Sequence, residues 1–420
     1  MEMGNSFLTS CENKNLEKVR EYMEQGLNVN IKCDNNFALK YAITTDDSGL
    51  QLLDLLLTSP NIDVNMKDGN QRTALMLSCI SGHIDITRRL IKARSIEINC
   101  QDYGGETALM LSFVNGDKDT TKKLLSMRGL DVNCKDNCGQ TALMLSSING
   151  DEDTIEKLLS MKDIDVNCQD KYGQTALMLS CINGHPEITK RLLAVPGVNI
   201  NCQDNDGETA AMFAVLDNNQ ECFEQLTYND EVDWNLQDTC GMTVVMWAID
   251  SDEIKYLEMI QNKNVRWNLK DYYGDTAFVL ALKSNRSEFA QFLLQVSDLE
   301  IDIYNLKAVM ECTIYISKKM INDQLCSQDI DNVINLYVYA YYNTMRNIAR
   351  VLIPDHEIAV KRCRELAGEM MTNDNNIHPE ENMTELVYAL KTNLDNLSLI
   401  LASSVTIPDI LLLCKIYMFN

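Results

Sequence analysis

One six-residue sequence recurs along this chain at a nearly constant interval. Thr-Ala-Leu-Met-Leu-Ser begins at Thr73, Thr107, Thr141 and Thr175, and looser copies begin at Thr209, Thr243 and Thr276. The interval is 34 residues each time except the last, where it is 33. A fixed period of this length is typical of a solenoid, in which one small structural unit is stacked on copies of itself. Such a stack offers an extended surface for binding rather than a pocket for catalysis.

The residues of one repeat, 170–203, predict a tight turn followed by two helices. Gly173 tolerates the positive φ that the tip of the turn requires. Thr175 is a hydroxyl cap for the first helix, and Gly184 ends that helix. Pro186 lies just inside the second helix, where its missing amide hydrogen costs nothing.

The residues between these landmarks resemble the ankyrin repeat. Each copy reads Asp-x-x-Gly-x-Thr-Ala-Leu-Met-Leu-Ser, then Asn-Gly-His or a variant, then Leu-Leu and Asp-Val-Asn. Tetratricopeptide repeats have a similar period, but they need a Trp, a Leu-Gly and a Tyr at offsets where this chain lacks them. The resemblance implies an all-α fold, an ankyrin-repeat solenoid of helix pairs with β-hairpin tips. We count about nine repeats over residues 5–303.

The repeats depart from the usual ankyrin pattern at two positions. Ankyrin repeats commonly have Thr-Pro-Leu-His, in which the His braces neighbouring hairpins, whereas this chain has Ala and Met at the Pro and His positions. Ala is a good helix former and Met fills irregular gaps, so the expected fold is unchanged. We expect weaker polar bracing between repeats and a more flexible stack.

The period ends near Ile303, and the rest of the chain predicts a second domain. Residues 304–420 place apolar side chains at helical spacing in several segments, which predicts a helical bundle that caps the stack or contacts a partner. The apolar tail, residues 397–419, contains Pro408, Asp409 and Lys415. A membrane span needs about 20 mostly apolar residues, so we expect two buried helices rather than an anchor.

The charge of the chain narrows the class of partner. Its 61 acidic and 37 basic residues give a formal charge of -24. Nucleic acids and anionic membranes attract basic surfaces, so we expect neither as a ligand. A protein partner with a basic patch fits better, although a soluble, self-repelling surface would have the same composition. We expect a monomer in the cytoplasm or nucleus, and no basic, apolar leader precedes Phe7.

The sequence predicts no catalytic, cofactor or metal site. It has no phosphate-binding loop, nucleophile elbow or His-Glu-x-x-His motif. His83 and His185 fall at the turn after the first helix, and we interpret them as turn residues. His356 and His378, with Cys363 between them, leave a Cys-His pair open, but a solvent-facing His is the favoured interpretation. We therefore expect no enzymatic activity.

Cysteines recur with the repeat but do not predict disulfides. Cys100, Cys134, Cys168 and Cys202 are spaced by 34 residues. Equivalent positions of stacked helices lie about 8–10 Å apart, whereas a disulfide needs Cα atoms about 4.4–6.8 Å apart. We interpret the four as buried, reduced thiols. Cys134 and Cys138 flank a tip without the further ligands that a zinc site needs.

The resemblance also implies where a partner binds. In ankyrin proteins the partner surface is the concave side, built from hairpin tips and first helices. The matching residues here are Tyr103, Glu106, Asn137, Gln140, Lys171, Tyr172, Gln174, Asp206, Glu208, Tyr272, Tyr273 and Asp275. Tyrosine is a rigid amphipathic anchor, and amides and carboxylates form an adaptable rim. Tyr103, Tyr172 and Tyr273 either anchor a protein ligand or simply lie on exposed turns.

Two functions are consistent with these features. The first is a non-catalytic scaffold or adaptor that binds proteins on the concave surface. The second is a substrate receptor of a ubiquitin ligase acting through the C-terminal domain, because residues 407–411 loosely resemble the opening of an F-box. The resemblance further implies that Asn99, Asn133 and Asn167 are candidates for hydroxylation by an asparaginyl hydroxylase, although tying the hairpin backbone together would explain them without modification.

Overall fold

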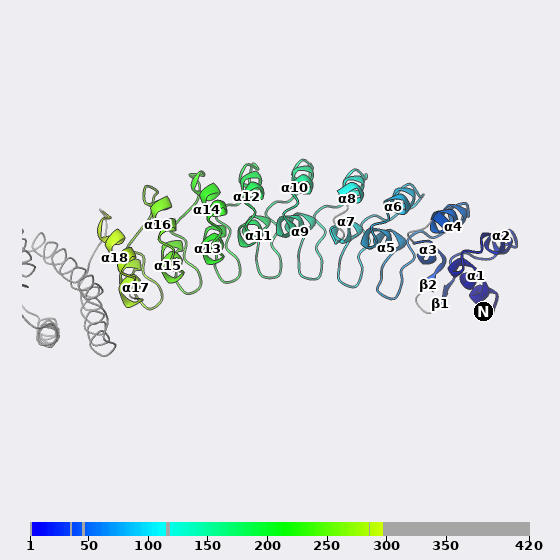
Figure 1. Ribbon diagram of the computed structural model, residues 1–420, viewed down its shortest axis with the longest axis horizontal. Helices are drawn as coiled ribbons and strands as arrows, with labels where there is room; N and C mark the ends of the chain where they lie inside the picture. The colour runs from blue at the N-terminus through cyan, green and yellow to red at the C-terminus, as the bar shows by residue number, and fades with distance from the viewer. Residues whose placement is uncertain (1, 34–35, 44–46, 115–117, 285, 297–420) are drawn as a thin grey trace, which may run out of the picture. The chain divides into compact units, whose positions relative to one another are not determined.

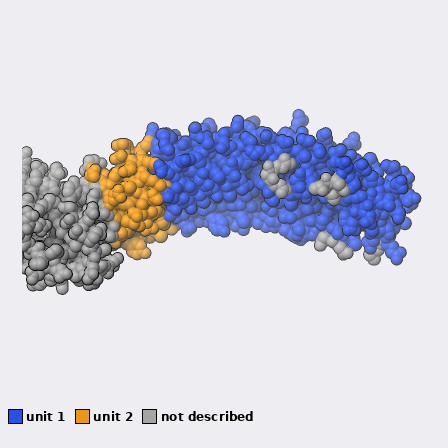
Figure 2. Space-filling model, in the orientation of Figure 1, with its two compact units in different colours: residues 1–232 blue, residues 233–420 orange. Residues whose placement is uncertain are grey.

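The structure is a computed structural model that describes residues 2–33, 36–43, 47–114, 118–284 and 286–296. The chain divides into two compact units, residues 1–232 and 233–420 (Figure 2). Helices dominate the described part of each unit, as the sequence predicts. The helical bundle expected over residues 304–420 lies outside the described residues.

The first unit is a series of helix pairs, each an inner helix followed by an outer helix. Figure 1 shows the inner helices in one row and the outer helices in a second, with the tips extending from the inner row along the concave side. The elements are α1 (Glu2–Glu12), α2 (Leu16–Glu24), β1 (Lys32–Cys33), β2 (Asn36–Phe37), α3 (Ala38–Tyr41), α4 (Asp47–Leu57), α5 (Ala74–Ile80), α6 (Ile84–Leu90), α7 (Ala108–Ser112), α8 (Lys118–Leu125), α9 (Ala142–Asn149), α10 (Glu152–Leu159), α11 (Ala176–Ile182), α12 (Pro186–Leu193), α13 (Ala210–Leu216) and α14 (Gln220–Thr227).

The second unit repeats this arrangement over its described residues. Its helices are α15 (Val244–Asp250), α16 (Lys255–Ile260), α17 (Ala277–Lys283) and α18 (Ser287–Leu294). The inner helices α15 and α17 pack against each other. Trp234 and Trp267 are buried at the position that Val132 and Val166 occupy in the first unit, so larger side chains fill the core here.

Inner helices begin at a threonine cap, as the sequence predicts. The hydroxyl of Thr175 accepts a hydrogen bond from the backbone nitrogen of Met178 at 3.3 Å. The sulfur of Met178 accepts one from the backbone nitrogen of Thr175, also at 3.3 Å. A capping box usually has Glu or Gln in the second role. The same reciprocal pair opens α5, α7 and α9, so methionine keeps a polar contact at the position where ankyrin repeats commonly have His.

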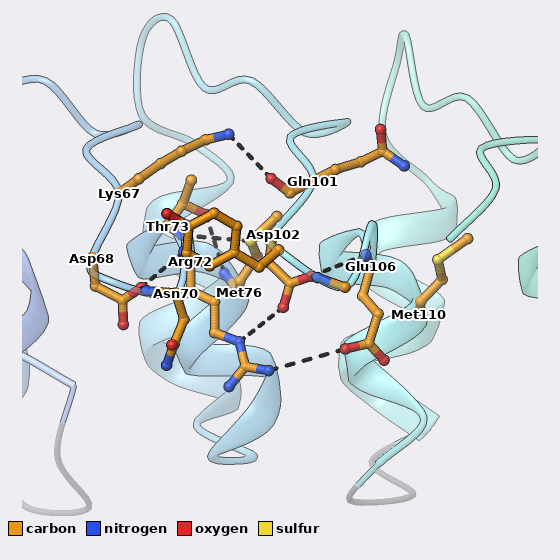
Figure 3. Close-up of polar contacts among 12 residues, drawn as sticks. Lys67, Asp68, Asn70, Arg72, Thr73, Met76, Gln101, Asp102, Glu106 and Met110 are labelled. Carbon is orange, nitrogen blue, oxygen red and sulfur yellow. Dashed lines mark hydrogen bonds and ion pairs between the residues drawn. The ribbon is translucent and has the colours of Figure 1, made fainter. Parts of the chain in front are cut away.

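Polar side chains also join one repeat to the next. The ammonium of Lys67 donates to the carbonyl of Gln101 at 3.1 Å (Figure 3). The side-chain amide of Gln101 donates to the carbonyl of Lys135 at 2.8 Å, and the ammonium of Lys135 donates to the carbonyl of Gln169 at 2.7 Å. Long Lys or Gln side chains at the start of several tips thus reach across to the following repeat, so polar bracing is present at a position that the sequence analysis did not identify.

Candidate functional site

An aspartate carboxylate organises seven of the tips. Oδ1 of Asp170 accepts hydrogen bonds from the backbone nitrogens of Tyr172 and Gln174, both at 2.9 Å. Gly173 completes the turn with a φ of 81°. This aspartate recurs with the repeat in the sequence, but the pattern alone did not predict its role. The same two acceptor contacts form at Asp68, Asp102, Asp136, Asp204, Asp238 and Asp271.

The described tips have less strand pairing than the β-hairpins that the resemblance implies. Strands β1 and β2 form one antiparallel pair of two residues each. Isolated bridges join Lys67 to Thr73 and Lys270 to Thr276, and the other tips in the described ranges have no strand. The carboxylate contacts do not by themselves prevent pairing, since Asp68 and Asp271 make them within the two tips that are bridged.

Consecutive tips of the first unit are joined through their backbones. The nitrogen of Lys171 donates to the carbonyl of Cys138, and the nitrogen of Asn205 donates to the carbonyl of Tyr172, both at 2.9 Å. A Cβ added to Gly173 would lie 2.7 Å from the backbone nitrogen of Asn205. Glycine is therefore required by the close approach as well as by its positive φ. The tips form a row whose members hold one another in place.

Tyrosines of this row are open to solvent. Tyr103 and Tyr172 are 67% and 66% exposed. Asn137, Lys171 and Asp206 are exposed as well. The remaining predicted residues of the first unit lie half-buried at the base of a tip, directly before a threonine cap: Glu106, Gln140, Gln174 and Glu208. The predicted partner-binding residues thus divide into an exposed group on the tips and a half-buried group below them.

The second unit presents a tip of the same kind. Tyr272 and Tyr273 are 79% and 88% exposed. Asp275, at the base of this tip, is half-buried, and its carboxylate forms an ion pair with Lys283 at 2.5 Å. Two adjacent aromatic rings are therefore available here beside a carboxylate whose charge is already paired.

The negative charges near Tyr103 are partly balanced within the chain. Nε of Arg72 donates to Oδ2 of Asp102 at 2.9 Å, and its Nη2 lies 4.0 Å from Oε2 of Glu106 (Figure 3). Partial burial and the negative charge of Asp102 raise the pKa of Glu106, while Arg72 acts to lower that pKa. One guanidinium thus faces two carboxylates, so this tip keeps part of its negative charge.

Asparagines in the segments that follow the outer helices tie neighbouring repeats together. The side-chain nitrogen of Asn133 donates to the carbonyl of Asp163 at 2.7 Å, and its oxygen accepts from the backbone nitrogen of Asp165 at 2.9 Å. Asn99 and Asn167 make the equivalent contacts. This structural role is the one expected from the sequence, and their hydroxylation stays a prediction.

The four recurring cysteines are free but only half-buried, which corrects the expectation of full burial. They lie at the repeat edge, where polar groups surround them, and Sγ of Cys168 is 3.4 Å from Oδ2 of Asp165. Burial raises the pKa of Cys134 and of Cys168 to about 11, and the neighbouring aspartate adds to the effect. These thiols are therefore protonated near neutral pH, the form that reacts poorly.

The histidines of the repeats lie in turns, as predicted. His83 and His185 are the caps of α6 and α12, and Nε2 of His185 lies 3.0 Å from the carbonyl of Ile148. Within the described ranges, no three His, Cys, Asp or Glu side chains are placed to hold a metal ion. The possible Cys-His pair involving Cys363 lies outside the described residues. So does the apolar tail at residues 397–419.

None of the helices described is both long enough and apolar enough to cross a membrane. The repeats themselves are matched by a family model described as ankyrin repeats (3 copies), over residues 45–136, 112–204, 143–238 and 212–305. A search of curated proteins finds no match. Ankyrin repeats generally mediate protein–protein interaction. Because the matched segments span more than half of its length, the chain belongs to the ankyrin-repeat family.

Proposed function

We propose that this protein is a non-catalytic scaffold or adaptor that binds protein partners on the surface formed by the tips and inner helices. The observation that carries the proposal is the exposure of Tyr103 and Tyr172 on tips that are fixed by hydrogen bonds. Tyrosine is enriched at protein interfaces, where it often contributes much of the binding free energy. The other large aromatic side chains of the tips, Tyr272 and Tyr273, are exposed in the same way.

The fixed geometry of the tips favours binding. A tyrosine ring has only two side-chain torsions to immobilise, so little conformational entropy is lost when it enters a partner's pocket. The backbone that carries Tyr172 is held by Asp170 on one side and by Asn205 of the next tip on the other. A surface that is already ordered loses less conformational entropy on binding, so more of the interaction free energy contributes to affinity.

The test is affinity capture followed by mass spectrometry with the full chain. We expect partners captured by the wild type to be lost when Tyr103 and Tyr172 are both changed to alanine. Tyr228→Ala is the matched control, because Tyr228 is 71% exposed but follows the outer helix α14 rather than lying on a tip. Retention of every partner by the double variant, or equal loss with the control, would contradict the proposal.

The alternative, a ubiquitin-ligase substrate receptor, rests on residues 407–411, which lie outside the described residues. It stays a prediction, and recovery of a cullin or its adaptor in the same capture would support it. The expected cytoplasmic or nuclear location and the monomeric state also stay predictions.

A further inference from the structure

In the first unit, the repeat that begins at Asp204 carries three carboxylates on the surface formed by its tip and inner helix. Asp206 lies on its tip, Glu208 at the base of the tip and Asp217 at the end of α13. The equivalent residues one and two repeats earlier are all uncharged: Tyr172, Gln174 and Asn183, and Cys138, Gln140 and Asn149. The charge is therefore a property of this repeat and not of the repeat pattern.

Two of these carboxylates have no cation of their own. Asp206 and Asp217 are exposed, and neither forms an ion pair with another described residue. Partial burial raises the pKa of Asp217, which means that its charge is held in an unfavourable setting. By contrast, Glu156 on the outer helix α10 lies 3.0 Å from Arg191. A carboxylate already paired within the chain has less to gain from a partner.

An exposed aromatic ring lies on the neighbouring tip. Tyr172 and Asp206 occupy equivalent positions of consecutive tips, and the backbone bond from Asn205 to Tyr172 brings those tips together. A ring face beside a carboxylate suits a guanidinium or ammonium group, which can stack on the ring and pair with the acid. Lys171, the cation of the same tip, forms no ion pair with Asp206.

We propose that the surface from Tyr172 to Asp217 binds an extended segment of a partner protein that is rich in arginine and lysine. This inference rests on the proposed protein-binding function and adds the chemistry of the partner. An extended chain advances about 3.3–3.6 Å per residue, and stacked helices lie about 8–10 Å apart. A cation paired with Asp206 and a second cation, three residues away and stacked on Tyr172, would therefore lie on consecutive repeats. Nucleic acid, whose phosphates the carboxylates repel, fits poorly.

The probe for this proposal is a short fluorescent peptide in which every third residue is arginine and the others are glycine and serine. Fluorescence anisotropy with the full chain at about 0.15 M salt, where the Debye length is about 8 Å, measures its Kd. We expect Asp206→Asn combined with Asp217→Asn to raise Kd about tenfold, and Tyr172→Ala to raise it about threefold. The matched control changes Glu187 and Glu221 to glutamine, which removes two exposed charges from the outer helices α12 and α14.

The control distinguishes binding of the peptide at a defined site from its nonspecific attraction to the net charge of -24. Under the proposal it changes Kd by less than about twofold, because exposed charges distant from a ligand are screened. Equal weakening by both double variants, no effect of the Asp206 and Asp217 changes, or no binding would each overturn the proposal. Partners captured through Tyr172 that carry no basic segment would reject this inference while leaving the proposed function in place.

Discussion

Replacing Asn133 with alanine should lower the free energy of unfolding by about 1–3 kcal/mol. The side chain makes two hydrogen bonds to the following repeat, at 2.7 and 2.9 Å. Each is worth about 0.5–1.5 kcal/mol net, and the substitution also leaves the carbonyl of Asp163 and the nitrogen of Asp165 without this partner. The loss is large against the total of about 5–15 kcal/mol that is typical of a folded domain.

The assay is urea unfolding of the full chain followed by circular dichroism, with the shift of the midpoint as the measured quantity, since repeat arrays need not unfold in one step. Asn133→Asp keeps the acceptor but turns the donor into a second acceptor, so it should also destabilise. Asn149→Ala, at an exposed position of α9, should change stability by less than about 0.5 kcal/mol. A wild-type midpoint for Asn133→Ala, or an equal shift for Asn149→Ala, would refute the reasoning.

Three further predictions concern the tips, the helix caps and the thiols. Gly173→Ala should lower the free energy of unfolding by more than about 1 kcal/mol, and by more than Gly197→Ala does. Both glycines have positive φ, but only at Gly173 would the new Cβ meet a neighbouring tip, at 2.7 Å. Equal urea midpoints for the two variants would contradict this prediction. Thr175→Ala should lower the free energy of unfolding by about 1 kcal/mol, and Thr175→Ser should lower it much less. A wild-type melting temperature for both variants would show that the cap contributes nothing to stability. Near pH 8, iodoacetamide should modify exposed Cys138 before Cys134, whose pKa of about 11 keeps it protonated. The Cys134 rate, followed by peptide mass spectrometry, should rise about tenfold per pH unit below that pKa, and a rate independent of pH would exclude this.

Features that depend on neighbours in the sequence were predictable. Thr175 caps its helix, Pro186 lies in the first turn of α12 and Gly173 adopts positive φ, as expected from residue type alone. The bracing by Lys67 and Gln101 was missed, because each side chain contacts a carbonyl 34 residues further on. Such a contact depends on how closely the repeats stack, which the period does not specify.

The candidate site was predictable to a similar extent. The spacing identified Tyr103 and Tyr172 as tip residues, and their exposure follows from the tip geometry. It did not separate them from Gln140 and Gln174, which are half-buried because they directly precede a helix cap. Nor did it distinguish a carboxylate that is ion-paired within the chain from one, such as Asp206, that is not.

Cross-linking mass spectrometry on a captured complex tests the central claim, that partners bind the tip surface, most directly. A lysine-reactive reagent reports on both faces of the first unit, since Lys135 and Lys171 are exposed on the tip side, while Lys123 in α8 and Lys190 in α12 are exposed on the outer helices. The account predicts that cross-links to the partner concentrate at Lys135 and Lys171. Cross-links concentrated at Lys123 and Lys190 would contradict it.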